Sequence, residues 1–88
     1  MIGVYIHPSG LTEEVYRSID EGLRAAGVEP KGIKMHSCFG EGDGLAIFDV
    51  WESEKDWQTF AAHLEPIAAA AGVAVTSEIV PMVAFDVP

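Results

Sequence analysis

The junction that follows Trp51 constrains the fold most strongly, because an apolar run there passes directly into an amphipathic segment. Residues 45–51 are mostly apolar and indicate a strand. Ser53, with Asp56 three positions later, forms the pattern of a helix N-cap, and apolar residues then recur at helical spacing as far as Ala71. The sequence therefore predicts a strand that is followed at once by a helix.

The remaining segments complete a β-α-β-β-α-β order, which is the split βαβ of ferredoxin-like folds. Pro66 predicts a kink or a break in the second helix near residues 62–64. We expect one α+β domain over residues 1–88, with a four-stranded antiparallel sheet and both helices on one face. Alternation, capping residues and turns place the other elements as a strand from Ile2 to Ile6, a helix after Thr12 that ends at Gly27, a strand from Ile33 to Phe39, a hairpin loop from Gly40 to Gly44 and an extended segment from Val73 to Val87.

Composition restricts the partners of this domain. The formal charge of −9 repels phosphate backbones and anionic lipids, so we expect no nucleic-acid or membrane partner. Cys38 is the single cysteine and the N-terminal apolar run is short, which predicts a cytoplasmic protein without an internal disulfide. The three histidines lie in no metal-ligand spacing, and we expect neither a metal nor a cofactor.

Strand alternation predicts what the helix-free face of the sheet carries. Ile2, Val4 and Ile6, together with Ala46, Phe48 and Val50, form wholly apolar sets that are expected under the helices. The opposite set is too apolar to be left in water and too polar for an ordinary core. We therefore expect a homodimer in which two such faces enclose a small cavity. That opposite set consists of Gly3, Tyr5, His7, Lys34, His36, Cys38, Leu45, Ile47, Asp49 and Trp51.

Several residues of this set are candidates for chemistry. Asp49 interrupts an apolar strand and would act as a general base or substrate anchor, or alternatively as a hydrogen-bond acceptor at the dimer interface. His7 and His36 would act as bases or contact a ligand, or would simply be hydrogen-bonded histidines. Cys38 next to His36 suggests a reactive thiol, although a lone cysteine is commonly a small buried apolar residue.

Aromatic side chains supply further candidate ligand contacts. Tyr5 and Trp51 could line a cavity for an aromatic ligand, or could pack across a dimer interface. The Gly40-x-Gly42-x-Gly44 pattern resembles a phosphate loop but precedes a strand, and we therefore interpret it as a turn.

The stretch from Phe48 to Leu64, with Trp51-Glu52-Ser53 at its junction, resembles the small antibiotic biosynthesis monooxygenase-like proteins of the dimeric α+β barrel superfamily. The resemblance extends over most of the chain in element order. It implies a homodimer and one of several activities: cofactor-free oxidation of aromatic or quinol substrates with O2, haem degradation, isomerisation of muconolactone type, or no reaction at all.

The same resemblance bears on individual residues. Haem-degrading members carry a tryptophan at the position of Phe60 and a histidine near Ala69 or Ala70, so haem degradation is not expected. Many monooxygenase-like members have a histidine at Phe60, whereas this chain has His63 one turn later. Some relatives hold their cavity between helices and sheet within one subunit. That arrangement would bring Tyr16, Trp57, Phe60 and His63 into the site and remove Cys38 from it.

Two hypotheses follow for function. The first is a cofactor-independent monooxygenase acting on a small aromatic, quinol or polyketide-like substrate, in which Asp49 or a histidine ionises a hydroxyl group. The second is a homodimer that binds a small molecule in the same cavity without catalysis.

Overall fold

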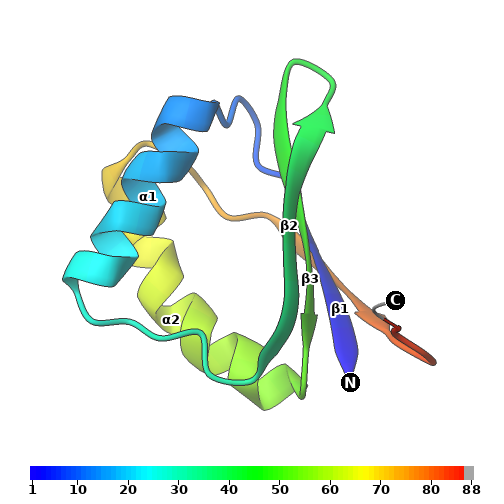
Figure 1. Cartoon of the computed structure of the whole chain (residues 1–88). Coiled ribbons are helices and arrows are strands. Elements are labelled where there is room, and N and C mark those ends of the chain that lie inside the picture. Colours follow the sequence, from blue (N-terminus) through cyan, green and yellow to red (C-terminus); the bar gives the residue numbers. More distant parts are fainter. Residues whose placement is uncertain (87–88) are drawn as a thin grey trace.

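The computed structural model describes residues 1–86, and its elements follow the predicted order. They are β1 (Ile2–Ile6), α1 (Glu13–Ala25), β2 (Ile33–Glu41), β3 (Gly44–Trp51), α2 (Glu54–Ala70) and β4 (Ser77–Pro81). The strands form one antiparallel sheet in the order β2-β3-β1-β4, and both helices lie on the same side of it (Figure 1). The predicted ferredoxin-like fold is thereby confirmed. Of the last predicted extended segment, only Ser77–Pro81 is strand, and Val87 lies outside the described residues.

Local sequence signals account for where the helices begin and end. The Thr12 hydroxyl accepts a hydrogen bond from the Val15 amide, and the Ser53 hydroxyl accepts one from the Asp56 amide, each at 3.2 Å. A glycine with positive φ follows each helix closely, as Gly27 does α1. No helix within residues 1–86 has the length and apolar character needed to cross a membrane.

Helix α2 is not divided at Pro66, because it continues from Glu54 to Ala70. The predicted break is therefore absent. Ala61 before the proline and Ala68 after it are both buried in the core, so packing holds the two halves of the helix in one element.

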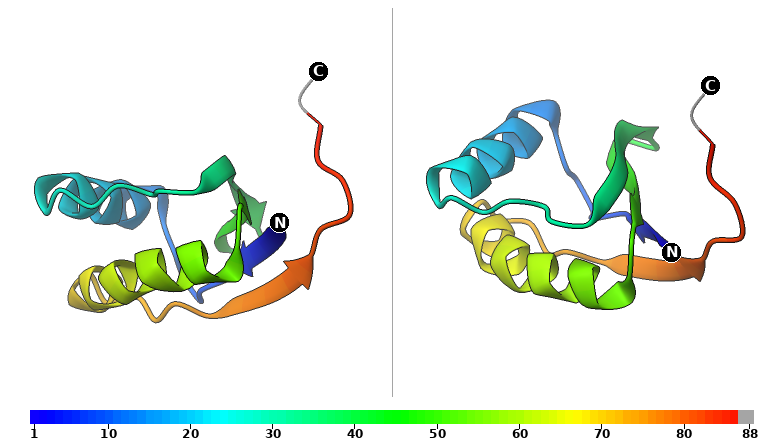
Figure 2. Two further views of the ribbon diagram at one scale, coloured as in Figure 1. Left: turned by 90° about the horizontal axis from the view of Figure 1, so that it is seen from below. Right: turned by 60° about the horizontal axis from the view of Figure 1, so that its bottom comes forward.

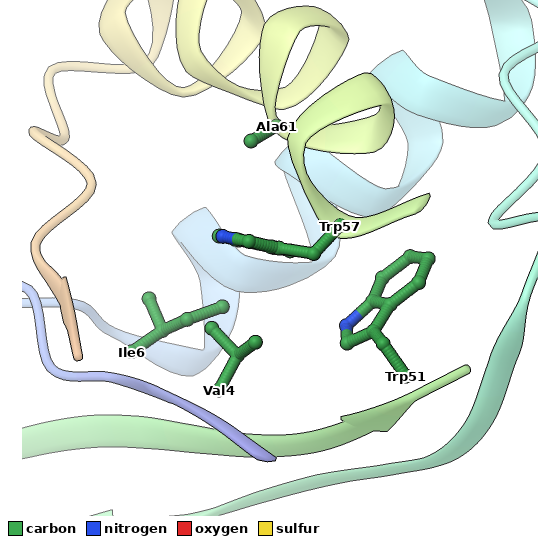
Figure 3. Close-up of a cluster of buried hydrophobic side chains, with 5 residues drawn as sticks. All are labelled: Val4, Ile6, Trp51, Trp57 and Ala61. Atoms are coloured by element: carbon green, nitrogen blue, oxygen red, sulfur yellow. The ribbon is translucent and has the colours of Figure 1, made fainter. Parts of the chain in front are cut away.

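The core lies between the helices and the sheet and consists of two clusters. The first is centred on Val4, Ile6, Trp51, Trp57 and Ala61. Figure 3 shows the indole of Trp57, from α2, lying between that helix and the sheet, with the indole of Trp51 beside it at the end of β3. The two ring centroids are 5.8 Å apart. The second cluster joins the far ends of the helices through Leu11, Ile19, Ala68 and Val73.

Strand register corrects the predicted faces of β2 and β3. Asp49 pairs with Val4 on one side and with His36 on the other. Val4 is buried under the helices, so its cross-strand neighbours point to the helices as well. The predicted face of β1 was right, but those of β2 and β3 were reversed. The helix side carries His36, Cys38, Leu45, Ile47, Asp49 and Trp51. The helix-free side carries Ala46, Phe48 and Val50. The error has a physical cause: β3 is apolar on both faces, so alternation alone does not determine which face is inside.

Candidate functional site

A cavity of about 270 Å³ lies between the helices and the sheet of a single chain. Its wall is largely apolar and is formed by residues that include Ile6, Leu11, Ile19, Leu23, Phe60 and Leu64. This position matches the alternative in which the cavity is enclosed within one subunit. The polar side chains that reach the cavity are Tyr16, Asp20, Arg24, His36 and Asp49.

Asp49 is the buried carboxylate of this cavity, with 3% of its surface exposed. Its Oδ1 lies 2.6 Å from Nδ1 of His36, the residue opposite it on β2. A carboxylate only accepts hydrogen bonds, so the Nδ1 atom carries the proton and donates it. The hydrogen bond to Asp49 raises the pKa of His36 above its usual value, against the opposing effect of burial.

Tyr16 extends this pair into a chain of three side chains. Its hydroxyl oxygen lies 2.6 Å from Nε2 of His36, and the two rings are nearly parallel. When His36 is neutral with its proton on Nδ1, Nε2 is an acceptor and the tyrosine hydroxyl donates. Burial is the main cause that raises the pKa of Tyr16, which keeps the phenol protonated. The Asp49–His36–Tyr16 chain thus places a base and a proton donor at the cavity wall.

Asp20 and Arg24 form an ion pair on α1 and line the same cavity. Arg24 Nε lies 3.0 Å from Asp20 Oδ2, and both side chains are exposed. Neither residue was predicted from the sequence as part of the site. Their spacing was the available signal, because Tyr16, Asp20 and Arg24 follow one another at intervals of four and share one helix face.

Trp51 and Trp57 pack behind the cavity wall. Trp51 has no exposed surface, and its Nε1 atom finds no hydrogen-bond acceptor within residues 1–86. Its ring contacts that of Phe60, with centroids 5.2 Å apart, and Trp57 completes this aromatic cluster. Phe60 lines the cavity, whereas the two tryptophans support it from behind.

The other predicted site residues lie outside the cavity lining. Tyr5 and His7 are stacked on each other and, from the register of β1, lie on the helix-free face, where His7 Nε2 is 3.2 Å from Glu78. Cys38 is on the helix side of β2, and burial raises the pKa of its thiol, which disfavours a thiolate. His63 is exposed on α2.

Comparisons with known proteins show the fold. No family model and no curated protein matches the chain. Among solved structures, a point mutant of SnoaB, a cofactor-independent oxygenase from Streptomyces nogalater, matches with a TM-score of 0.55 and 20% identity over 98% of this chain and 92% of that chain. The chain shares its fold with this oxygenase.

A second solved structure agrees with the first. The protein NE2512 of unknown function from Nitrosomonas europaea matches with a TM-score of 0.58 and 19% identity over 99% of this chain and 91% of that chain. Together the two structures confirm the fold that the resemblance implied.

Proposed function

We propose that this protein is a cofactor-independent oxygenase for a small hydroxylated aromatic substrate. The observation that supports the proposal most directly is the Asp49–His36–Tyr16 chain at the wall of an apolar cavity. A base beside an apolar cavity suits the ionisation of a phenol or an enol, because the first step of such an oxidation makes the substrate electron-rich. The fold shared with a cofactor-independent oxygenase adds support.

In the proposed reaction His36 is the base and Tyr16 transmits the proton. As the substrate hydroxyl gives its proton to the Tyr16 oxygen, Tyr16 passes its own proton to Nε2 of His36. Asp49 does not contact the transferred proton. It is a positioning residue that holds the Nδ1–H tautomer and stabilises the imidazolium that forms.

The substrate supplies the electrons for the oxygen chemistry. The ionised ring transfers an electron to O2, and the two radicals combine into a carbon–oxygen bond. The peroxide anion then recovers the proton held by the base. Removal of the hydrogen on the same carbon as a proton then breaks the O–O bond. Overall, the substrate loses its hydroxyl hydrogen and one ring hydrogen, one oxygen atom of O2 becomes a new C=O group, and the other leaves as water.

The dimensions of the cavity suggest the size of this substrate. A volume of about 270 Å³ lies just below the roughly 300–1,000 Å³ of ordinary ligand pockets. Apolar side chains such as Ile19 and Leu64 would contact the ring, while Tyr16 would bind the hydroxyl group. We therefore propose a neutral aromatic substrate with few rings and at least one hydroxyl group.

Oxygen uptake with a panel of hydroxyaromatics tests the proposal. His36→Gln should lower the rate on an accepted substrate by about 10²–10⁴-fold, the usual contribution of a general base. His63→Gln is the matched control, since it removes an exposed histidine outside the cavity lining and should leave the rate unchanged. Uptake that survives in His36→Gln would refute the assignment of the base.

A non-catalytic binding protein is the second candidate, and the largely apolar wall of the cavity favours it. Such a protein would bind members of the same panel in a calorimeter. It would consume no oxygen, whatever residue is present at position 36.

We also propose that the protein works as a homodimer in the cytoplasm, paired through the helix-free face of the sheet. Phe39 and Val80 lie on that face and are 40% and 44% exposed. Residues 82–86 leave the sheet on the same side and carry the fully exposed Val83 (Figure 2). Val80→Lys should yield monomers in native mass spectrometry, whereas a wild-type monomer would refute the pairing.

A further inference from the structure

Phe60 is shared by two hollows of the molecule. One is the cavity between the helices and the sheet, called here the inner cavity. The other, called the outer groove, has a volume of about 420 Å³ and lies between α2 and the connection from α1 to β2. Its wall includes Glu29, Lys31, His63 and Ile67. Phe60 lines both hollows, so its side chain lies where they adjoin.

The connection from α1 to β2 forms another part of the wall between the two hollows. The connection from α1 to β2 runs alongside α2 (Figure 1 and Figure 2). Its Pro30 lines the inner cavity, while its neighbours Glu29 and Lys31 line the outer groove. The connection at Pro30 and the Phe60 ring therefore both lie between the inner cavity and the groove, beside the backbone of α2.

The contacts of the Phe60 side chain allow its ring to move. The residue is only partly buried, and its ring leans against Trp51 and Trp57 with centroid distances of 5.2 and 6.4 Å. Rotation about its side-chain torsions moves the ring without moving the helix backbone, and such rotations are fast for partly exposed residues.

We infer that Phe60 is a specificity-determining residue, which closes the inner cavity toward the outer groove and limits the length of the aromatic ligand. The inference rests on the proposed function only in taking the inner cavity as the ligand site. A ligand anchored by its hydroxyl group at Tyr16 would end against the Phe60 ring. Without that ring, a longer ligand would continue into the outer groove.

The composition of the outer groove agrees with this inference. Its apolar side chains, such as Ile67 and Pro66, would contact the extra ring. Its polar side chain Lys31 would contact substituents at the far end of a longer ligand. Phe60→Ala should therefore shift the preference toward longer ligands instead of only weakening the binding of short ones.

Calorimetric binding of a hydroxylated aromatic series from one to four fused rings tests the inference. Relative to wild type, Phe60→Ala should bind the three- and four-ring members at least about tenfold more tightly, because more apolar surface is buried. Phenol should gain nothing. Two matched controls enlarge only one hollow each: Leu64→Ala the inner cavity and Ile67→Ala the outer groove.

The outcomes separate a partition from a general loss of packing. Neither control should change the preference for ring number. Phe60→Leu leaves an apolar side chain packed on the core, and it should shift the preference for ring number in the same direction as Phe60→Ala. An equal shift in Leu64→Ala would overturn the inference, as would an unchanged preference in both Phe60 variants. Absence of binding by wild type and all variants would overturn it too. If the variants bind with the expected shift but no oxygen is consumed, the inference about Phe60 would stand and the proposed oxygenase activity would be refuted.

Discussion

Replacing His36 by alanine should destabilise the protein, because the buried carboxylate of Asp49 then loses its hydrogen-bond partner. Asp49 is almost fully buried, and its hydrogen bond to His36 is its principal compensation for burial. Loss of a hydrogen bond to a charged group costs about 1.5–3 kcal/mol. The side chain of His36 is 44% exposed, so water enters part of the vacated space and the cost should fall toward the lower end of that range.

A double-mutant cycle isolates this effect. Once His36 is gone, the further change of Asp49 to alanine removes a buried charge that has lost its partner, and should cost little. The coupling between the two substitutions should therefore reach about 1 kcal/mol or more.

The pH dependence of the coupling has a definite sign. Because the folded-state pKa of His36 is raised, its contribution to stability is complete below the unfolded value of about 6.5 and is lost as pH rises through the folded value. Urea unfolding followed by the fluorescence of Trp51 and Trp57, at pH 6 and at pH 9, measures both cycles. His63→Ala, an exposed control, should change stability by less than about 0.5 kcal/mol. Additive effects at pH 6, or a coupling that grows toward pH 9, would refute the reasoning.

The other predictions concern a cap, a turn and the reaction itself. Ser53→Ala should cost about 1 kcal/mol in thermal unfolding, because the first turn of α2 loses its cap. Gly32→Ala should cost more than about 1 kcal/mol in urea unfolding, since Gly32 has a φ of 92° and a methyl group there would overlap the side chain of Asp56. Tyr16→Phe should slow oxygen uptake by about 10²-fold with the fold intact in circular dichroism. The acid limb of the wild-type uptake rate should lie above pH 6.5, because His36 must be neutral to act as a base.

The element order could be predicted from sequence because caps, turns and periodicity are local signals. The location of the cavity could not. Asp49 looks like a residue that avoids a core, but its burial is compensated by its cross-strand partner His36, which is in turn hydrogen-bonded to Tyr16 of α1. Those partners depend on strand register and on the packing of α1, which alternation along a single strand does not contain. The alternative of a cavity within one subunit did identify Tyr16 and Phe60, since both belong to helical apolar stripes.

The hairpin formed by β2 and β3 has a consequence for how the protein folds. His36 and Asp49 are only 13 positions apart and are opposite each other on the two strands, which a two-residue turn at Gly42 and Asp43 connects. Hairpins of this kind close in about 1–10 μs, before more distant strands are recruited. The imidazole can therefore be in place while the carboxylate is still hydrated, and β1 and α1 then enclose a pair that already exists. During folding, the hairpin would carry the His36–Asp49 pair from the moment it closes, and the elements that pack onto it afterwards would supply the apolar walls around the pair.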